Sequence, residues 1–136
     1  MKILLFSIVT LFSIQTYANN KPIDTYLFKV QIGNQLYKEK LDIYKKEFIN
    51  YQSNKVYGYY SVPGLFKSKF VGVISHYTHH LGYVSFIKGK FIANERGLKK
   101  LITLEAKATG GPIFIGTLKE NNHVFARISG KRVDNE

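Results

Sequence analysis

Three histidines, His76, His79 and His80, lie within five residues and form the densest group of metal-binding side chains in the chain. Imidazole nitrogens suit Zn²⁺ or Cu²⁺, and a strand would place His76 and His80 on the same face. A catalytic zinc site normally adds a carboxylate, yet no Asp or Glu lies between Glu47 and Glu95. We therefore expect a polar hairpin connection over 76–82 that holds no metal. Protonation of these histidines on acidification is the alternative role.

Other signatures of catalysis are absent from the sequence. The chain has no Cys, which excludes a thiol nucleophile, a thiolate metal site and disulfides. It also lacks G-x-S-x-G, H-E-x-x-H and the glycine-rich loops that hold phosphates. The nine carboxylates are scattered, and their spacing does not indicate a glycosidase pair. The sequence therefore predicts a protein that is not an enzyme and uses no cofactor, with an unrecognised hydrolase as the remaining enzymatic alternative.

Basic residues outnumber acidic ones, 20 to 9, which gives a net charge of +11 and favours anionic partners. Four lysines fall on one face if residues 65–75 pair with residues 83–92: Lys67, Lys69, Lys88 and Lys90. A hairpin centred between His79 and His80 would put Lys69 opposite Lys90, an unfavourable pair that hints at an anionic partner. The alternative is a solubilising outer face on which lysines prevent edge pairing.

The opposite face of the same hairpin is apolar, with Phe66, Phe70 and Phe91 among its residues. Pro63 and Gly64 fit the central positions of a type II turn, and a strand joined there would add Tyr57 and Tyr59 to this face. Buried tyrosine hydroxyls need partners, so these rings belong to a core or line a pocket with polar groups. The residues that we predict to bind a ligand are Tyr57, Tyr59, Phe66, Phe70 and Phe91.

Alternating apolar residues separated by turn residues predict about eight strands. The expected strands cover residues 25–32, 35–44, 56–62, 65–75, 83–92, 98–107, 113–119 and 123–129. Residues 45–55 are ambiguous, because Leu41, Tyr44, Phe48 and Tyr51 are near helical spacing and permit a helical turn.

Short connections without a crossover helix indicate antiparallel pairing between neighbours in sequence. The predicted fold is therefore all-β, a small up-and-down barrel, with a two-sheet sandwich as the alternative. The strand count and lengths resemble those of calycin-type barrels such as lipocalins and avidins. The chain has no Trp, so it lacks the Gly-x-Trp of lipocalins and the tryptophans of the avidin site. The resemblance is one of architecture, and biotin binding does not follow from it.

Residues 1–18 have the order of a secretory signal peptide: Lys2, an apolar run of 12 residues at 3–14, and small residues Thr16 and Ala18 before the cleavage point. The run is too short to span a bilayer, so we expect no transmembrane segment in the mature chain. Residues 19–136 are expected to form one domain, with 130–136 as a frayed tail. Export without Cys or glycosylation sequons indicates a bacterial protein that is secreted or periplasmic.

Two functions follow from these patterns. The first is a barrel that carries a small apolar or amphipathic ligand in its interior. The second is an envelope interaction or inhibitor protein whose lysine face binds an anionic envelope component or an acidic protein. Mixed lysines and aromatic residues also suit nucleic acid, but export argues against that partner. The sequence does not decide whether the interior is hollow or filled.

Overall fold

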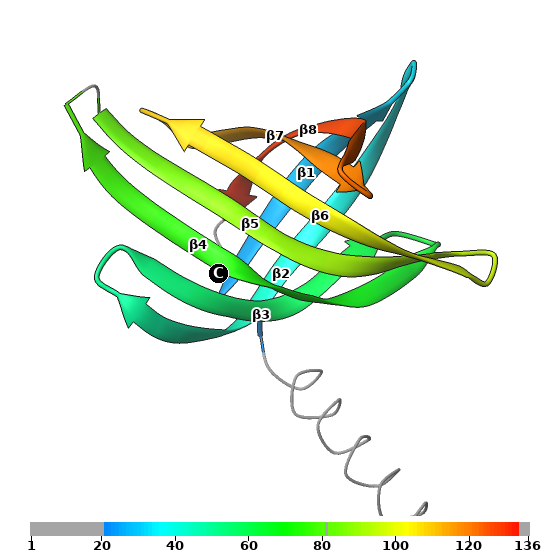
Figure 1. Cartoon of the computed structure of the whole chain (residues 1–136), viewed down its shortest axis with the longest axis horizontal. Coiled ribbons are helices and arrows are strands. Elements are labelled where there is room, and N and C mark those ends of the chain that lie inside the picture. Colours follow the sequence, from blue (N-terminus) through cyan, green and yellow to red (C-terminus); the bar gives the residue numbers. More distant parts are fainter. Residues whose placement is uncertain (1–20, 81, 134–136) are drawn as a thin grey trace, which may run out of the picture.

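The structure is a computed structural model that describes residues 21–80 and 82–133, without the side chains of His79 and Glu95. The strands are β1 (Asp24–Ile32), β2 (Gln35–Asn50), β3 (Ser53–Val62), β4 (Phe66–His79), β5 (Gly82–Glu95), β6 (Leu98–Thr109), β7 (Ile113–Glu120) and β8 (His123–Val133). All neighbours pair antiparallel, and β8 returns to β1 to close a barrel (Figure 1). This confirms the predicted all-β up-and-down barrel of eight strands and excludes the sandwich.

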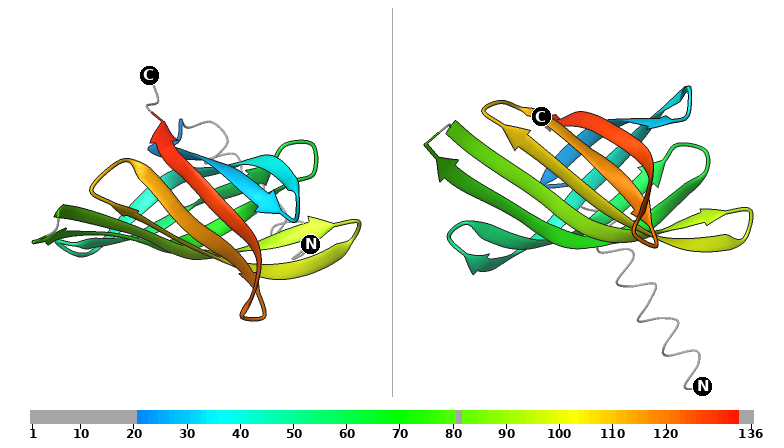
Figure 2. Two further views of the ribbon diagram at one scale, coloured as in Figure 1. Left: turned by 90° about the horizontal axis from the view of Figure 1, so that it is seen from above. Right: turned by 45° about the horizontal axis from the view of Figure 1, so that its top comes forward.

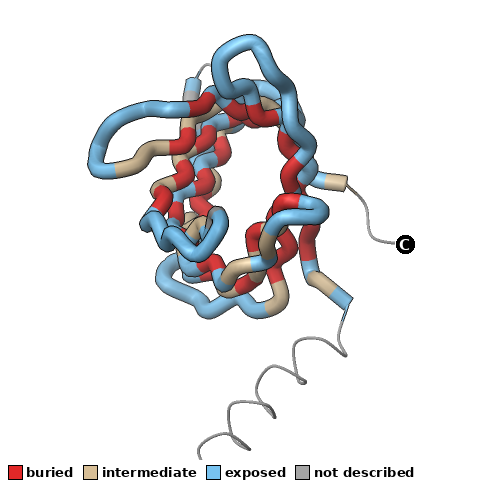
Figure 3. The backbone as a smooth tube through the Cα atoms, turned by 90° about the vertical axis from the view of Figure 1, so that its right-hand side faces the viewer, coloured by how far each residue is buried: buried red, intermediate tan, exposed pale blue. Residues whose placement is uncertain are grey.

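Side chains alternate between the barrel interior and the outer surface. Seen along the barrel, buried and exposed residues alternate along the strands that surround the interior (Figure 3). The long strands β4, β5 and β6 run side by side, and the turned views show β8 beside β1 at the closure (Figure 2). Among the described residues there is no helix long and apolar enough to cross a membrane.

The connection between β3 and β4 has three residues and decides which tyrosines point inward. The Leu65 N–H donates to the Val62 carbonyl at 3.0 Å, and Gly64 has φ +79°, as expected for a type II turn. Leu65 is the third connecting residue, because Val62 pairs with Phe66. A change of one residue in a connection moves every side chain of a strand to the other face. The prediction that Tyr57 and Tyr59 point inward is therefore wrong, and Tyr60 is the buried tyrosine of β3.

The hairpin of β4 and β5 keeps its predicted faces but not its predicted register. Phe70 pairs with Phe91, and Val71 pairs with Lys90, so Lys69 is not opposite Lys90. The difference arises because β4 continues to His79, which pairs with Gly82. His76 and His79 therefore belong to a strand, and the polar connection predicted over 76–82 is shorter. A shift by two residues leaves the apolar residues inside and the lysines outside.

Two other predictions about the chain differ from the structure. Residues 45–50 continue β2 in place of a helical turn, and β2 and β3 form one long hairpin. Residues 130–133 belong to β8, since Val133 pairs with Thr25 of β1, so the predicted frayed tail is wrong there. Residues 134–136 and the predicted signal peptide at 1–18 lie outside the described residues.

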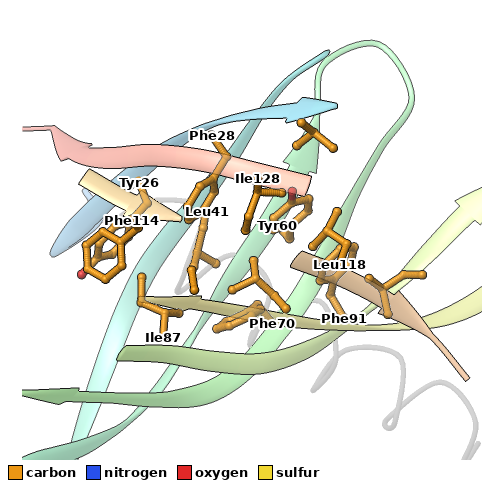
Figure 4. Close-up of a cluster of buried hydrophobic side chains, with 14 of the residues drawn as sticks. Tyr26, Phe28, Leu41, Tyr60, Phe70, Ile87, Phe91, Phe114, Leu118 and Ile128 are labelled. Carbon is orange, nitrogen blue, oxygen red and sulfur yellow. The ribbon is translucent and has the colours of Figure 1, made fainter. Parts of the chain in front are cut away.

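Aromatic and aliphatic side chains fill the middle of the barrel (Figure 4). At one end of the cluster the Tyr26 and Phe114 rings meet edge to face at 5.6 Å, and towards the other end Tyr60 and Phe91 stack at 4.0 Å. Leu41 and Leu104 lie fully buried in the same cluster. The interior is therefore a packed core, of the kind that an eight-stranded barrel can just fill with side chains.

Two inward-facing glycines make room for the Phe70 ring. Gly72 of β4 pairs with Gly89 of β5, and the ring covers this pair. A Cβ built on Gly89 would lie 2.2 Å from Phe70 Cζ and 2.7 Å from the Val71 carbonyl oxygen. Neither group can move away easily, because the ring is buried in the core and the carbonyl belongs to the backbone of β4.

We predict that Gly89→Ala lowers the free energy of unfolding by about 2–3 kcal/mol, the usual range for an overpacked core. Urea unfolding at neutral pH measures this. Gly111→Ala is the matched control, because a Cβ there meets no atom within 4 Å. Equal stability of the two variants would contradict the packing described for Phe70.

Candidate functional site

A cavity of about 370 Å³ opens at the end of the barrel where β1 turns into β2 and β3 turns into β4. We call this cavity the mouth. All eight strands contribute to its lining, through Ile32, Glu39, Val62, Phe66, Phe91, Ile102, Leu118 and Phe125. A concave, mainly apolar site with a few polar groups is the usual form of a small-molecule site.

A stack of three aromatic rings leads from the core to the mouth. The buried Tyr60 ring stacks on Phe91 at 4.0 Å, and Phe91 stacks on the half-buried Phe66 at 6.2 Å. These rings come from β3, β5 and β4, so their positions are fixed by three neighbouring parts of the barrel wall. The stack gives the mouth a rigid apolar wall.

A buried carboxylate lies at the inner side of the mouth. Glu39 of β2 is 7% exposed and accepts a short hydrogen bond from the Tyr60 hydroxyl through Oε1. Burial raises the pKa of Tyr60 well above its ordinary value, and the negative charge of Glu39 and the hydrogen bond to it raise it further. The Tyr60 hydroxyl therefore stays protonated and can donate its hydrogen bond to Glu39, whose buried carboxylate requires hydrogen-bond donors.

The rim of the mouth adds one ion pair and one aromatic ring whose direction is set by a β-bulge. Lys100 Nζ lies 3.8 Å from Glu120 Oε2. Leu118 pairs with Ala126 and Lys119 pairs with Val124, which leaves Phe125 as the extra residue of a bulge. Bulges commonly redirect a side chain, and this one puts Phe125 in the lining. The mouth thus holds two carboxylates and one ammonium group, although the chain as a whole is strongly basic.

The predicted ligand-binding residues lie in three different places. Phe66 and Phe91 line the mouth. Phe70 lies deeper, in the packed core over the glycine pair. Tyr57 and Tyr59 lie on the outer surface, where they flank a shallow groove over Gly58. The structure therefore brings together two of the five predicted residues.

The sequence prediction missed Glu39 and Tyr60. Glu39 shares one face of the strand with Tyr37, Leu41 and Ile43. A carboxylate on an otherwise apolar face was therefore a signal available from the sequence. Tyr60 had no such signal, because its orientation depends on the length of the connection after β3.

The four predicted lysines, Lys67, Lys69, Lys88 and Lys90, are all exposed on the outer face of β4 and β5. We call this set the lysine face. The Lys67 ammonium lies 4.8 Å from the centre of the Tyr59 ring, and Lys88 lies 3.9 Å from Glu105. Among the side chains that the structure describes, Lys69 and Lys90 form no ion pair. The face therefore keeps most of its positive charge.

The barrel end opposite the mouth is closed by charged and polar groups. Lys46 Nζ and Arg132 Nη1 lie 2.5 Å and 3.6 Å from the two oxygens of the buried Asp24. His76 Nδ1 lies 2.9 Å from Ser85 Oγ, and burial lowers the pKa of His76, with Lys46 and Arg132 acting in the same direction. In the part of the chain that the structure describes, no three His, Asp or Glu side chains are grouped as metal ligands.

Comparison with known proteins gives no relative. No family model, no curated protein and no solved structure matches this chain. Any function must therefore be argued from the residues of the barrel themselves.

The buried tyrosines predict an alkaline limit of stability. Burial, together with the charge of Asp24, raises the pKa of Tyr26 to about 12, and the pKa of Tyr60 is also raised. Above pH 10 the unfolded chain loses both phenolic protons while the folded chain keeps them, so the folded state binds more protons and stability falls as pH rises. We expect a loss of about 1 kcal/mol per pH unit for each group.

Urea unfolding between pH 9 and pH 11 tests this on Tyr60→Phe. The variant should lose stability with a smaller slope above pH 10, because one of the two groups no longer titrates. Tyr51→Phe is the control, since that ring is exposed. An unchanged slope in Tyr60→Phe would contradict the raised pKa.

Proposed function

We propose that this protein is an exported, non-enzymatic binding protein that holds a small amphipathic ligand in the mouth of its barrel. The observation that carries the proposal is the cavity of about 370 Å³ lined from all eight strands, with an apolar wall and a buried carboxylate at its inner side. A volume near the lower end of the usual range suits a ligand of about a few hundred daltons.

The packed core restricts where such a ligand can lie. Side chains from every part of the wall meet in the middle of the barrel, so the interior predicted as a carrier cavity is occupied. The mouth lies at the end of the barrel where the strands end in turns, and residues from all eight strands line it. A ligand would therefore place its apolar part against Phe66 and Phe91 and would remain accessible from one end.

The charges of the mouth favour a ligand with a cationic or hydrogen-bond-donating head. Glu39 accepts from Tyr60, and a carboxylate can accept several hydrogen bonds. The residues that line the mouth include two carboxylates, Glu39 and Glu120, and one ammonium group, Lys100, which lies 3.8 Å from Glu120. An amine or a group with N–H donors would be attracted to Glu39, and an anionic head would be disfavoured.

Native mass spectrometry of residues 21–136, purified without denaturation, tests the proposal. We expect an additional mass of about a few hundred daltons that is lost on denaturation. Ala93→Trp should abolish it, because Ala93 lines the mouth and an indole would fill the space.

Asn94→Trp is the matched control, because Asn94 is the next residue of β5 and is exposed. It should retain the bound mass. A wild-type protein without any bound mass would contradict tight carriage of a ligand that the host supplies. Equal loss in both variants would contradict the mouth as its site.

A second candidate function rests on the lysine face. In the observed register the four lysines form one diagonal row across β4 and β5, in the order Lys67, Lys69, Lys90 and Lys88. Neighbouring positions in this row are about 7 Å apart. A row of ammonium groups at this spacing suits an extended polyanion. Because Lys88 and Glu105 are exposed, their pair contributes little and would compete weakly with such a partner.

The salt concentration at which the protein elutes from immobilised heparin measures how strongly the lysine face binds a polyanion. Lys69→Glu with Lys90→Glu should elute at clearly lower salt than Lys38→Glu with Lys99→Glu, which changes the net charge equally at exposed sites elsewhere. The reason is that a row of charges binds a linear polyanion more strongly than dispersed charges do. Identical elution of the two double variants would show that net charge alone is responsible.

A further inference from the structure

The end of the long β2–β3 hairpin exposes three large apolar or aromatic side chains. Phe48 is 77% exposed, Ile49 is 50% exposed and Tyr51 is 90% exposed. They fall within four consecutive residues. Single exposed apolar residues are normal on soluble proteins, whereas a concentration of them marks a contact surface. We call residues 48–54 the hairpin tip.

The hairpin tip projects from the barrel wall on a fixed backbone. β1 pairs with β2 only as far as Ile43, so among the described residues no strand pairs with the later part of β2 on that side (Figure 1, left). A bulge makes Ile49 an extra residue between Phe48 and Asn50. The tip is nevertheless tied to β4, because the His76 N–H donates to the Gln52 carbonyl at 2.8 Å. The exposed side chains are therefore presented by ordered structure.

Lysines border the hairpin tip on both sides. Residues 48–54 carry no charge, Lys45 and Lys46 precede them and Lys55 follows them. The Lys45 and Lys55 ammonium groups each lie 5.4 Å from the centre of the Tyr57 ring, which holds both beside the tip. Glu47 is the acidic residue of this segment and lies 3.1 Å from Lys45. The tip is thus apolar at its end and basic at its base.

We propose that the hairpin tip inserts into an anionic lipid surface. Phe48, Ile49 and Tyr51 would enter the boundary between headgroups and acyl chains, where aromatic rings are favoured. Lys45 and Lys55 would then reach the lipid phosphates, which attract basic residues close to the surface. A protein cleft would also accept three apolar side chains, but the neutral end with lysines behind it on both strands matches the layered chemistry of a lipid surface more closely.

This surface contact is independent of ligand binding in the mouth. The β2–β3 turn lies at the end of the barrel opposite the mouth, since the two ends alternate along the meander. A protein attached through the hairpin tip would therefore keep its mouth directed away from the lipid.

Co-sedimentation with vesicles tests the proposal. The probe is a vesicle of phosphatidylethanolamine and phosphatidylglycerol, compared with one of phosphatidylcholine alone. Residues 21–136 are used, because all eight strands and the closure lie within 24–133 and the apolar run at 3–14 would bind lipid by itself. We expect binding to the anionic vesicles that weakens with added salt, and much weaker binding to phosphatidylcholine.

The deciding variant replaces Phe48, Ile49 and Tyr51 by serine and should reduce binding to anionic vesicles by about tenfold or more. Its matched control replaces Leu36, Leu98 and Ile115, which are 70%, 68% and 68% exposed away from the tip, by serine and should bind as the wild type does. A far-UV circular dichroism spectrum and a urea unfolding midpoint equal to those of the wild type check that the tip variant is folded.

Three results would overturn the proposal. One is equal binding of the tip variant and the wild type to the anionic vesicles. The second is equal binding of the wild type to anionic and zwitterionic vesicles. The third is absence of wild-type binding to any vesicle, which would assign the tip to a protein partner instead. None of these results depends on whether the mouth holds a ligand.

Discussion

Pairing of β1 with β8 is the constraint on which the rest of the structure depends. It closes the sheet, removes both edges and divides every strand into an inner and an outer set of side chains. An eight-stranded barrel is narrow enough for the inner set to meet across the axis, and here aromatic rings do so. The inward glycines are part of the same solution, because the Phe70 ring needs the space that Gly72 and Gly89 leave. Closure therefore produces a packed middle and leaves space for a ligand at the end where Phe66 and Phe91 lie.

The fold was accessible from the sequence because its signals are local. Alternation along each strand and turn residues between strands predicted a meander, and its closure follows from the number and length of strands. The faces of β4 and β5 were also predictable, since lysines and phenylalanines alternate there. The register between neighbouring strands could not be predicted, because it depends on the length of each connection. One extra residue, Leu65, reversed the orientation of Tyr57 and Tyr59 and put Tyr60 inside.

The candidate site was only partly predictable for the same reason. Phe66 and Phe91 were identified from the apolar face to which they belong. The pair of Glu39 and Tyr60 joins residues 21 positions apart in sequence, and no spacing rule connects them. The bulge that turns Phe125 into the mouth is likewise a property of how β7 and β8 pair. Both features lie within hairpins of neighbouring strands, and they depend on a pairing register that the sequence alone does not fix.

The charges of the molecule are distributed so that its surfaces differ in chemistry. The lysine face and the base of the hairpin tip are basic, whereas the mouth contains more carboxylates than ammonium groups. Long-range electrostatic attraction would bring the protein to anionic surfaces, whereas the mouth would favour a ligand with a cationic or hydrogen-bond-donating head. Attachment and ligand binding would thus use different ends of one small barrel.

Amide chemical shifts of residues 21–136 during titration with octylamine test the central claim most directly. The account predicts saturable changes confined to the mouth, at residues such as Ala93, Ile102 and Leu118, and much weaker changes with octanoate. Changes centred on Asp24 and His76 at the opposite end, or equal responses to the amine and the acid, would contradict it.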